Sequence, residues 1–521
     1  MKKRRRIECL LSLLLSAVTM MSSCAIFSTD SSSEGMGEMR KPDYSQSTAE
    51  YDIWAYSSAC DDWYQYRNEE GEVVRIYFED GTRQTAERTQ LYADGGYNIL
   101  FVDWSFPNDY ATDFESSIMK RVMDDAYKSG LKCMIYEGKL HSLSSSHTSL
   151  IDPQNADGKT KFASQNDLEN YVAKRLRYVK EHPAFYGVSL VDEPYYTQLP
   201  AMGEIYRAVQ AVAPGAFCNL NLNPMSYDYR AMMRYCEEYK DADKNLEVTP
   251  QQVEEAYKKY LNDYYTYVGQ YSKYIQYDSY PLLEEKEWEG WETLLAEHVR
   301  NAQLVADFAA EKDMVFGHVY QTYCSSSRRN PTRTDMVWQV NIGMAMGVKN
   351  HSYYTYYPTP NTADTVLPDD TATIVDREGN PNANYYILQD IHKEMQFNAK
   401  ALMNFEYECS TYYTYGEIPG ETEFLSRIEK NTLQGIEGVE LSEAGAVLIS
   451  QQYDKTEDWR GYYVMNVTDP QCLTEIKVTL TLENCEYVQI YNGKEVETKK
   501  VKNGTVSIYV LTGQGVFVIP Y

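Results

Sequence analysis

The sequence predicts a (β/α)8 TIM barrel followed by a small C-terminal all-β sandwich. Between Tyr51 and about Tyr407, short apolar runs alternate with amphipathic stretches, as in repeated βα units. From about Ala444 the pattern changes to short strand-like runs separated by turns such as Asn492-Gly493. An open doubly wound sheet is the competing architecture, but no Gly-rich phosphate loop follows a predicted strand, which disfavours it.

The eight expected barrel strands are apolar runs bounded by turn-forming residues. They cover residues 53–56, 98–103, 132–136, 187–191, 217–222, 274–278, 314–320 and 348–354. Helices with an apolar face at helical spacing are expected over 82–94, 114–129, 166–181, 199–213, 291–311, 334–346 and 384–403. Two insertions are predicted, a hairpin over 72–81 and added helices over 227–270.

A chain of 521 residues is too long for one ordinary domain. We expect a signal peptide over 1–23, a disordered tether over 24–50, the barrel over 51–407, a connector over 408–443 and the sandwich over 444–521. The sandwich strands are expected at 446–451, 461–467, 476–482, 487–491, 506–510 and 515–519.

The start of the chain is typical of an export signal, with a charged segment over 1–6 and an apolar run over 10–21. Ser22-Ser23-Cys24 resembles the lipobox of bacterial lipoproteins, in which the cysteine is lipidated. Ordinary signal cleavage beside an unrelated cysteine is the alternative. No later segment has the roughly 18 uncharged apolar residues that span a bilayer. We therefore expect an extracytoplasmic protein that meets the membrane only through a lipid anchor at Cys24.

The chain is strongly acidic, with a formal net charge of −27 at pH 7. Removing residues 1–23, which hold five Lys/Arg and one Glu, takes this charge to −31. Such a surface disfavours nucleic acid and other polyanions as partners, and it suits a neutral substrate. Eight cysteines follow Cys24 without a C-x-x-C motif, and no histidines have paired metal-ligand spacing. We expect no metal and no cofactor; a disulfide between Cys472 and Cys485 is an open alternative to free thiols.

The stretch 185–196 organises the predicted site, because an apolar strand there runs into Asp192, Glu193 and Pro194. Pro194 favours an extended backbone at Glu193, which would hold the carboxylate at the carboxyl end of the strand. In a parallel barrel that end faces the active site. Glu193 is therefore the candidate catalytic acid. A helix cap or an ion pair with an arginine is its structural alternative.

Cleavage of a glycosidic bond needs a proton donor and usually a second carboxylate. Asp278, at the end of the predicted strand 274–278, is the first candidate for the second group, with Glu137 and Asp103 as rivals. Asp192 and Glu193 are adjacent, so on a regular strand they face opposite sides. Asp192 is therefore expected to anchor a loop or to orient substrate hydroxyls.

Tyrosine occurs 49 times and phenylalanine only 14 times. A tyrosine ring can stack on the apolar face of a sugar while its hydroxyl forms hydrogen bonds. The alternative is that these rings simply fill the core and the surface. The predicted substrate-binding residues are Asp192, Trp104, Glu137, Tyr195, Tyr280, Tyr320, Gln321 and Tyr354.

Three motifs together resemble uncharacterised bacterial barrel proteins related to the glycoside hydrolases. They are Tyr186-Gly-Val-Ser-Leu-Val-Asp-Glu-Pro194, Asn219-Leu-Asn221 and Tyr277-Asp-Ser-Tyr-Pro281. The wider kin of those proteins is clan A, which includes the family forty-two β-galactosidases. The resemblance implies that Glu193 is the acid, since the clan acid is a glutamate that ends the fourth strand.

Two departures from the clan pattern matter. The clan usually has Asn before the acid, where this chain has Asp192, and its nucleophile is a glutamate ending the seventh strand, where this chain offers Gln321. A neutral amide cannot form the glycosyl-enzyme ester of a retaining enzyme. We therefore predict an O-glycosidase acting on neutral carbohydrate with Glu193 and Asp278 as catalytic groups. A carbohydrate-binding protein without turnover is the first alternative, and a structural or adhesive role is the second.

Overall fold

The structure is a computed structural model that describes residues 40–57, 63–67, 72–77, 84–102, 113–226, 228–283, 291–325, 328–358, 373–418 and 428–521. Two compact units are distinguished, Met1–Lys41 and Pro42–Tyr521, and the second one contains the features described below. Cys24, Asp103 and Trp104 lie outside the described residues, so their predicted roles stay predictions.

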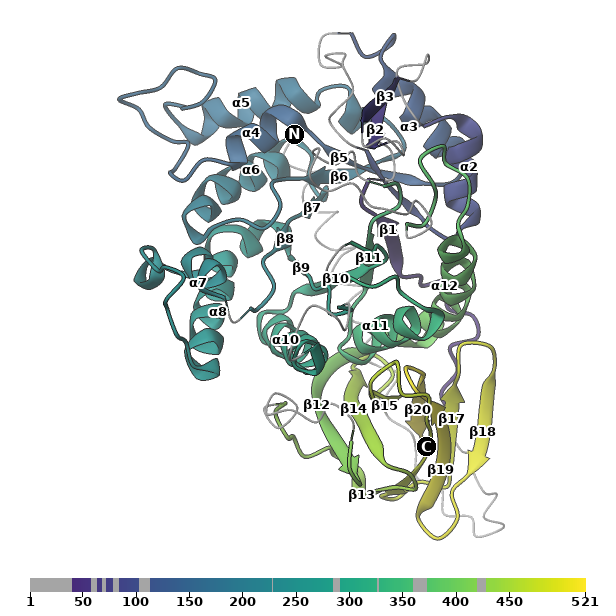
Figure 1. Cartoon of the computed structure of the whole chain (residues 1–521). Helices are drawn as coiled ribbons and strands as arrows, with labels where there is room; N and C mark the ends of the chain where they lie inside the picture. The colour runs from purple at the N-terminus through teal and green to yellow at the C-terminus, as the bar shows by residue number, and fades with distance from the viewer. Residues whose placement is uncertain are drawn as a thin grey trace, which may run out of the picture. The chain divides into compact units, whose positions relative to one another are not determined.

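The first part of the Pro42–Tyr521 unit contains two parallel sheets, with strand orders β1-β11-β10-β9-β8 and β4-β5-β6-β7 (Figure 1). The strands are β1 (Asp52–Ala55), β4 (Ile99–Val102), β5 (Lys132–Tyr136), β6 (Phe185–Ser189), β7 (Phe217–Asn219), β8 (Asn221–Leu222), β9 (Tyr274–Asp278), β10 (Val315–Gln321) and β11 (Asn350–Tyr354). Each predicted strand has a counterpart here, and only β5 and β9 match the expected bounds at both ends. This part is therefore a mixed α/β fold with parallel strands.

The two sheets are linked at both margins. On one side the chain passes directly from β7 to β8 through the buried Leu220. On the other side the Asn98 N–H donates to the Ile53 carbonyl at 3.0 Å. The Asn98 side chain also accepts from the Ile53 N–H at 2.8 Å and donates to the Tyr51 carbonyl at 2.8 Å. One polar side chain thus joins the start of β4 to β1.

Helices lie around the strands (Figure 1). They are α2 (Ala86–Asp94), α3 (Ile118–Lys128), α4 (Gly138–Ser144), α5 (Gln165–Leu176), α6 (Leu199–Val212), α7 (Tyr229–Tyr235), α8 (Pro250–Tyr264), α9 (Gln270–Ser272), α10 (Trp291–Lys312), α11 (Arg333–Ala345) and α12 (Ala383–Leu402). Several begin at a hydroxyl cap, as the sequence signals suggest. Thr249 and Gln252 form a capping box at the start of α8, with Pro250 in its first turn.

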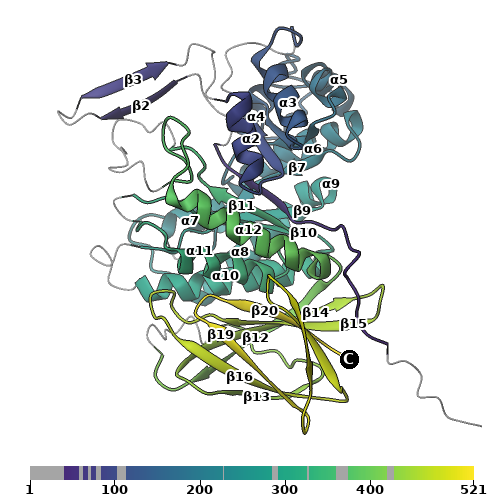
Figure 2. The same ribbon diagram turned by 90° about the vertical axis from the view of Figure 1, so that its right-hand side faces the viewer.

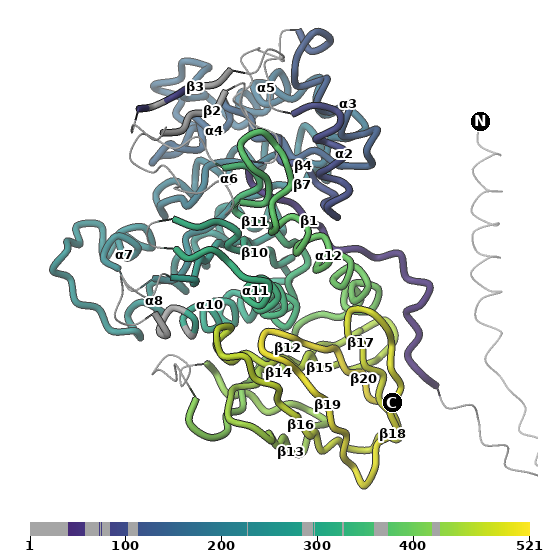
Figure 3. Tube along the Cα trace, turned by 45° about the vertical axis from the view of Figure 1, so that its right-hand side comes forward, coloured from purple at the N-terminus to yellow at the C-terminus, as the bar shows by residue number. Residues whose placement is uncertain are grey.

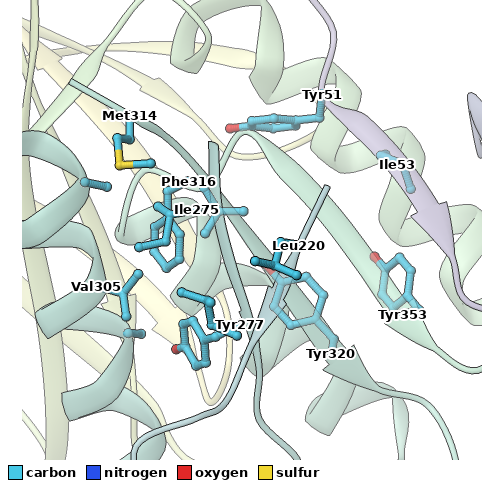
Figure 4. Packing of buried hydrophobic residues seen from close by; sticks show 14 of the residues in the cluster. Tyr51, Ile53, Leu220, Ile275, Tyr277, Val305, Met314, Phe316, Tyr320 and Tyr353 are labelled. Carbon is cyan, nitrogen blue, oxygen red and sulfur yellow. The ribbon is translucent and has the colours of Figure 1, made fainter. Parts of the chain in front are cut away.

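The core follows the period-two alternation of the strands. Ile275 and Tyr277 of β9 pack beside Phe316 of β10 and Val305 of α10, on the side of the strands that faces the helices (Figure 4). Each such side chain contributes roughly 1.5–3 kcal/mol when it is fully buried. The residues between them, such as Gln276, face the other side.

Gly317 leaves room for an aromatic side chain in the interior between the strands. A Cβ placed at this residue would lie 1.9 Å from the hydroxyl oxygen of Tyr274. Only glycine therefore allows Tyr274 to cross the interior at this height.

The predicted helical insertion is present as α7 and α8, which are neighbours in the trace (Figure 3). The buried face of α8 carries Tyr257, Tyr260 and Tyr264 at helical spacing, each fully buried. A π-helical turn, Tyr265–Gly269, continues α8. A Cβ at Gly203 of α6 would lie 2.1 Å from the Tyr267 carbonyl oxygen, so α6 and this turn can pack only because residue 203 is glycine.

The C-terminal part contains two antiparallel sheets, with orders β12-β14-β15-β20-β17-β18 and β13-β16-β19 (Figure 2). Their strands are β12 (Glu406–Tyr415), β13 (Ile436–Leu441), β14 (Gly445–Asp454), β15 (Trp459–Asn466), β16 (Glu475–Leu482), β17 (Tyr487–Tyr491), β18 (Val496–Lys500), β19 (Thr505–Leu511) and β20 (Gly515–Pro520). Valine and isoleucine from both sheets form a separate core. β12 and β13 arise in the segment that was expected to be a connector.

Side-chain hydrogen bonds join α11 and the turn that follows it to the C-terminal sheets. The Trp338 indole donates to the Val467 carbonyl at 3.2 Å, and the Tyr463 hydroxyl donates to the Asn341 side chain at 2.5 Å. Both partners are buried in each case. The C-terminal sheets therefore stabilise the parallel-stranded part and do not contribute to the site described below.

The predicted hairpin over 72–81 is wrong in its position. β2 (Trp63–Arg67) pairs with β3 (Val73–Tyr77), and Arg67 is opposite Val73. Both strands are rich in aromatic and β-branched residues, which favour strand structure. This preference outweighs the Asp80-Gly81 turn signal, on which the prediction of a later hairpin depended.

The described cysteines, including Cys472 and Cys485, are free thiols. The disulfide alternative for this pair therefore does not hold. Within the ranges described here, no helix is both long enough and apolar enough to cross a membrane.

Candidate active site

The carboxyl end of β6 departs from the extended backbone that was predicted. The strand ends at Ser189, and Glu193 has a positive φ of 45°, a left-handed conformation that is uncommon for a residue with a side chain. Its N–H donates to the Asn221 carbonyl at 3.0 Å. Contacts with β8 thus override the local preference that Pro194 imposes, and Asp192 and Glu193 do not lie on a regular strand with opposite faces.

Glu193 forms an ion pair with a residue of the insertion. Its Oε2 accepts a hydrogen bond from Arg234 of α7 at 2.6 Å, and the Glu193 side chain is 36% exposed. The same Arg234 nitrogen donates to Asn223 Oδ1 at 2.5 Å. The guanidinium also lies over the ring of Tyr195, 5.4 Å from its centroid. The structural alternative considered for Glu193, a pairing with arginine, is therefore present, and one carboxylate oxygen is occupied.

Asp192 lies beside Glu193 and carries a shifted pKa. Its Oδ1 accepts from Asn221 Nδ2 at 2.8 Å. Burial raises the pKa of Asp192 to about 6, and the charge of Glu193 acts in the same direction. The side chain is nevertheless exposed to solvent. The exposure and the raised pKa are compatible, because a carboxylate that lines a cavity can contact solvent on one side and be surrounded by protein atoms on the others.

Asp278, at the end of β9, is only 4% exposed. Its Oδ1 is buried and has no hydrogen-bond partner among the described residues. Burial raises the pKa of Asp278 well above its usual range, and the charges of Glu193 and Asp192 raise it further. The neighbouring polar side chains of Tyr280 and Asn221 oppose this shift. The three acidic side chains therefore form one electrostatically linked group, which we call the carboxyl cluster.

A cavity of about 210 Å³ opens beside Asp192. It is lined by Tyr56, Ser57, Phe101, Tyr136, Ser189, Leu190, Asp192 and Asn221. Asp192 is the only charged side chain among these described lining residues. Glu193 follows Asp192 directly in the chain, and Asp278 interacts electrostatically with both carboxyl groups.

Gln276 of β9 orients the groups at the cavity floor. Its Nε2 donates to the Tyr56 hydroxyl at 3.3 Å and to Asn221 Oδ1 at 3.5 Å. Because the side-chain oxygen of Asn221, Oδ1, is directed to Gln276, its side-chain nitrogen, Nδ2, is directed to Asp192. Gln276 is fully buried and thereby fixes the Asn221 amide that contacts the carboxyl cluster.

A series of neighbouring aromatic rings, the aromatic arc, begins in the cavity lining with Tyr136, Phe101 and Tyr56 and continues beyond that lining. In order, the rings are Tyr280, Tyr323, Tyr354, Tyr56, Phe101 and Tyr136, with neighbouring centroids 5.2 to 6.3 Å apart. Two of the predicted binding residues, Tyr280 and Tyr354, belong to this arc. Such an arrangement suits the stacking of a sugar ring.

Four other predicted binding residues lie outside both the cavity lining and the aromatic arc, namely Glu137, Tyr195, Tyr320 and Gln321. Tyr320 is 1% exposed, and its hydroxyl lies 2.8 Å from His351 Nδ1 on the side of β10 that faces the helices (Figure 4). Glu137 is also 1% exposed, caps α4 through the Leu140 N–H at 2.8 Å and forms an ion pair with Arg175. Both side chains therefore have structural partners.

Gln321 is fully buried beneath the loops that follow β9 and β10. Its Oε1 accepts from the Leu282 N–H at 3.0 Å, and its Nε2 donates to the carbonyls of Leu282 and Tyr323 at 3.3 and 3.2 Å. The amide that replaces the expected carboxylate thus holds two loops together. Tyr195 lies under Arg234, outside the cavity lining.

Sequence reasoning missed Asn221, Gln276, Tyr56 and Arg234. A signal existed for the first two, since Asn221 follows Asn219 and Gln276 precedes Asp278 by two residues, and polar residues two apart face the same side of a strand. Tyr56 directly follows β1. For Arg234 no signal exists, because nothing in an inserted helix indicates which strand end it will reach.

A larger cavity, of about 950 Å³, lies near the amino ends of β1, β9 and β10 and includes Asp52, Tyr274 and Lys349 in its lining. It is remote from the carboxyl cluster. Among the described residues, no group of three or more His, Cys, Asp or Glu side chains is arranged to hold a metal ion.

No protein-family profile matches the sequence, and no curated protein matches it. Solved structures do show similarity. A family 5 glycoside hydrolase from Bacteroides vulgatus is 10% identical, with 88% of this chain and 93% of that chain covered and a TM-score of 0.46. A GH30 endoxylanase from Clostridium papyrosolvens is 10% identical, with 91% and 97% covered and a TM-score of 0.40. An α-amylase from Anoxybacillus is 11% identical, with 90% and 97% covered and a TM-score of 0.42. At these scores and identities the likenesses carry no argument about this chain.

Proposed function

We propose that the protein is a glycoside hydrolase that acts on a neutral carbohydrate, with Asp192 as proton donor and Glu193 as the second carboxylate. The observation that carries this proposal is the position of Asp192. This carboxyl lies in a cavity beside an aromatic arc, and its pKa of about 6 lies close to neutral pH. A general acid works best when its pKa lies near the operating pH. A neutral sugar suits a lining with no other charge among its described residues.

In the proposed reaction, the leaving oxygen takes the Asp192 proton as the glycosidic C–O bond breaks. Glu193 faces the positive charge that develops on the sugar ring. Its carboxylate either bonds to the anomeric carbon or takes a proton from the attacking water. Water finally supplies the hydroxyl of the released sugar, and Asp192 regains its proton. Asp278, the partner predicted from the sequence, supports Asp192 electrostatically, because it is nearly inaccessible.

The proposal is tested by a hydrolysis screen on neutral polysaccharides and aryl glycosides, with reducing ends or released phenol as the readout. The wild type is expected to cleave at least one of them, and Asp192→Asn and Glu193→Gln are expected to lose that cleavage. Asp152→Asn is the matched control, since this half-buried carboxylate accepts hydrogen bonds from the Gln154 and Asn155 N–H groups of its own turn and does not belong to the carboxyl cluster. No cleavage of any glycoside by the wild type would contradict the proposal.

Leaving-group dependence separates the two carboxylates. An aryl glycoside with a good leaving group needs little help from an acid, whereas a natural glycan needs it fully. Asp192→Asn should therefore lose far more activity on the glycan than on the activated aryl glycoside. Glu193→Gln should lose activity on both. The opposite pattern would return the acid role to Glu193, as the sequence predicted.

Carbohydrate binding without turnover is the second candidate. The observation that favours it is Gln321, a buried amide engaged by loop backbone where the resemblance implies a carboxylate. A pure binder would hold a glycan equally tightly in the wild type, Asp192→Asn and Glu193→Gln. Calorimetric titration of the three proteins with the same oligosaccharide decides between the two functions.

We further propose that the two parallel sheets close into one (β/α)8 barrel. The contacts of Asn98 with Ile53 and the continuity of β7 with β8 support closure. Export and lipid anchoring at Cys24 are also proposed, on the sequence features alone. Mass spectrometry of the mature N-terminus tests the anchor, and Cys24→Ser should release the protein from membranes.

A further inference from the structure

We propose that the α7–α8 insertion is a positioning element for the carboxyl cluster and that Tyr260 is its key residue, acting through the carbonyl of Pro194. This inference rests on the proposed function for its kinetic consequences. The contacts that carry it involve the backbone and do not depend on any reaction.

The first observation is the strained backbone at Glu193. A left-handed φ in a residue with a side chain costs of order 1–3 kcal/mol and persists only where the surroundings hold it. Here the residue is followed by proline, which restricts its backbone further. Something must therefore hold the segment from Asp192 to Pro194 in place.

The second observation is the set of donors that do so. The Pro194 carbonyl accepts from the Tyr260 hydroxyl at 2.7 Å and from Asn223 Nδ2 at 2.8 Å. Asn223 Nδ2 also contacts the Tyr260 hydroxyl oxygen at 3.2 Å, and Asn223 Oδ1 accepts from Arg234. Tyr260 and Arg234 thus hold the two sides of one short segment, one through its backbone and the other through the Glu193 carboxylate.

The third observation is that the insertion itself is rigidly seated. Tyr260 is fully buried on the inner face of α8, and Tyr257 and Tyr235 donate to the carbonyls of Asn223 and Pro224 at 3.1 and 2.5 Å. Three hydroxyls therefore reach the loops after β6 and β8 from one small helical unit. A phenylalanine would fill the same space at any of these positions without making the bond.

The experiment compares Tyr260→Phe with Tyr264→Phe. Tyr264 lies one turn further along α8, is equally buried, and donates to the Tyr274 carbonyl at the opposite end of β9. Both variants lose one buried hydroxyl of the same helix, so both should lower the melting temperature by similar amounts. Only Tyr260→Phe should lower kcat, by about 10- to 100-fold, with KM unchanged, because it releases Pro194 and shifts the adjacent carboxylate.

A second readout needs no turnover. Carbon NMR of the Asp192 carboxyl should give a lower apparent pKa in Tyr260→Phe than in the wild type, since Glu193 moves away from it, and no change in Tyr264→Phe. Equal behaviour of the two variants in both readouts overturns the inference. A wild type without hydrolase activity, but with the Tyr260-specific NMR shift, overturns the proposed function alone.

Arg234→Lys is the second variant if Tyr260→Phe does not fold. It keeps the positive charge but replaces the guanidinium, whose Nη1 donates to both Glu193 and Asn223, with an ammonium group on a differently shaped side chain. The same fall in kcat and the same direction of the NMR shift are expected. An unchanged titration of Asp192 in a folded Arg234→Lys protein would count against the insertion as a positioning element.

Discussion

The two ends of the parallel strands carry similar residues in opposite electrostatic situations. Each end has buried or half-buried carboxylates, tyrosines and a cationic side chain. At the amino ends, Asp52 accepts from the Tyr186 hydroxyl at 2.5 Å and from Lys132 at 3.3 Å. At the carboxyl ends, three acidic side chains lie together, Arg234 forms an ion pair with Glu193, and one oxygen of Asp278 has no partner among the described residues.

The difference distinguishes a carboxylate that stabilises the fold from one that is available for chemistry. The Asp52 carboxylate has hydrogen-bond partners for both of its oxygens. Lys132 also lies 4.6 Å from the centroid of the Tyr186 ring, so Asp52, Lys132 and Tyr186 all contact one another and form what we call the Asp52 unit. In the carboxyl cluster, burial raises the pKa values of Asp192 and Asp278, and the excess negative charge of the cluster raises them further. Catalytic groups are commonly found in such unbalanced sites. Cavity size alone points to the amino ends, where the volume is about 950 Å³, against about 210 Å³ beside the carboxyl cluster.

The largest expected effect is the difference in activity between two variants, one that removes the carboxylate of Asp192 and one that removes the carboxylate of Asp52. Asp192→Asn should lower kcat/KM on a natural glycan by about 10²- to 10⁴-fold, the usual contribution of a general acid. Asp52→Asn should leave kcat/KM within a factor of two of the wild type. Steady-state kinetics with both variants checks this, and equal losses would erase the proposed distinction between the two ends.

The same pair should behave in the reverse way in unfolding experiments. Asp52→Asn removes the charged partner of Tyr186 and Lys132 and should lower the free energy of unfolding by about 1 kcal/mol. Asp192→Asn should not lower it at neutral pH, because the raised pKa of Asp192 means that ionising this carboxyl costs free energy in the folded state. Urea denaturation of both variants at pH 7.5 measures this crossover.

The second prediction concerns pH. Asp192 must hold its proton to act as an acid, and its pKa is about 6, so kcat/KM should fall as pH rises through about 6. The positive charge of Arg234 lowers the pKa of Asp192. Arg234→Met should therefore move the alkaline limb of the pH profile to higher pH, by up to about 1 pH unit. Lys132→Met, at the other end, should leave the limb where it is.

The third prediction uses Asp278. Its pKa is raised in the folded protein, so the folded state keeps this proton at pH values where the unfolded chain has lost it. Wild-type stability should therefore fall as pH rises above about 4, the ordinary pKa of an aspartate, until the folded group also ionises. Asp278→Asn lacks this dependence. Its stability relative to the wild type should rise between pH 5 and pH 8, as measured by urea denaturation at several pH values.

An opposite slope would contradict the cause assigned to the Asp278 shift. It would mean that the carboxylate is paired in the folded state, as Asp52 is at the other end. Asp52→Asn serves as the comparison, because the Asp52 carboxylate already has two partners. The stability of Asp52→Asn relative to the wild type should therefore not rise between pH 5 and pH 8.

The strands were predictable because each is a local pattern of apolar residues. β5 and β9 match their expected bounds, since apolar and aromatic residues dominate each five-residue segment. β12 was not expected, because its sequence, Glu406–Tyr415, mixes polar residues with tyrosines, and its pairing with β14 involves residues about 40 positions away. A strand of that kind is specified by its partner and not by its own sequence.

The site was predictable only in part, for a similar reason. The strand ends predicted that Glu193 and Asp278 would lie close together, since parallel strands bring their carboxyl ends to one edge, and the two side chains do interact electrostatically. Asp192 was expected to face the opposite side from Glu193, but it joins the same group. The roles within the group depend on the positive φ of Glu193 and on Arg234, and both are consequences of tertiary contacts with β8 and the insertion. No pattern in the sequence separates a satisfied carboxylate from an unsatisfied one.

The smallest expected effect tests whether the amino end is only structural. Lys132 is 51% exposed in its side chain and Asp52 is 23% exposed, so their 3.3 Å pair is largely solvated. Lys132→Met should lower the free energy of unfolding by about 0.2–1 kcal/mol, with a smaller loss at high salt. Activity should not change. A large loss of stability would mean that the Asp52 unit depends on the charge of Lys132 as strongly as Glu193 depends on Arg234. The amino and carboxyl ends would then have the same kind of ion pair and differ only in its strength.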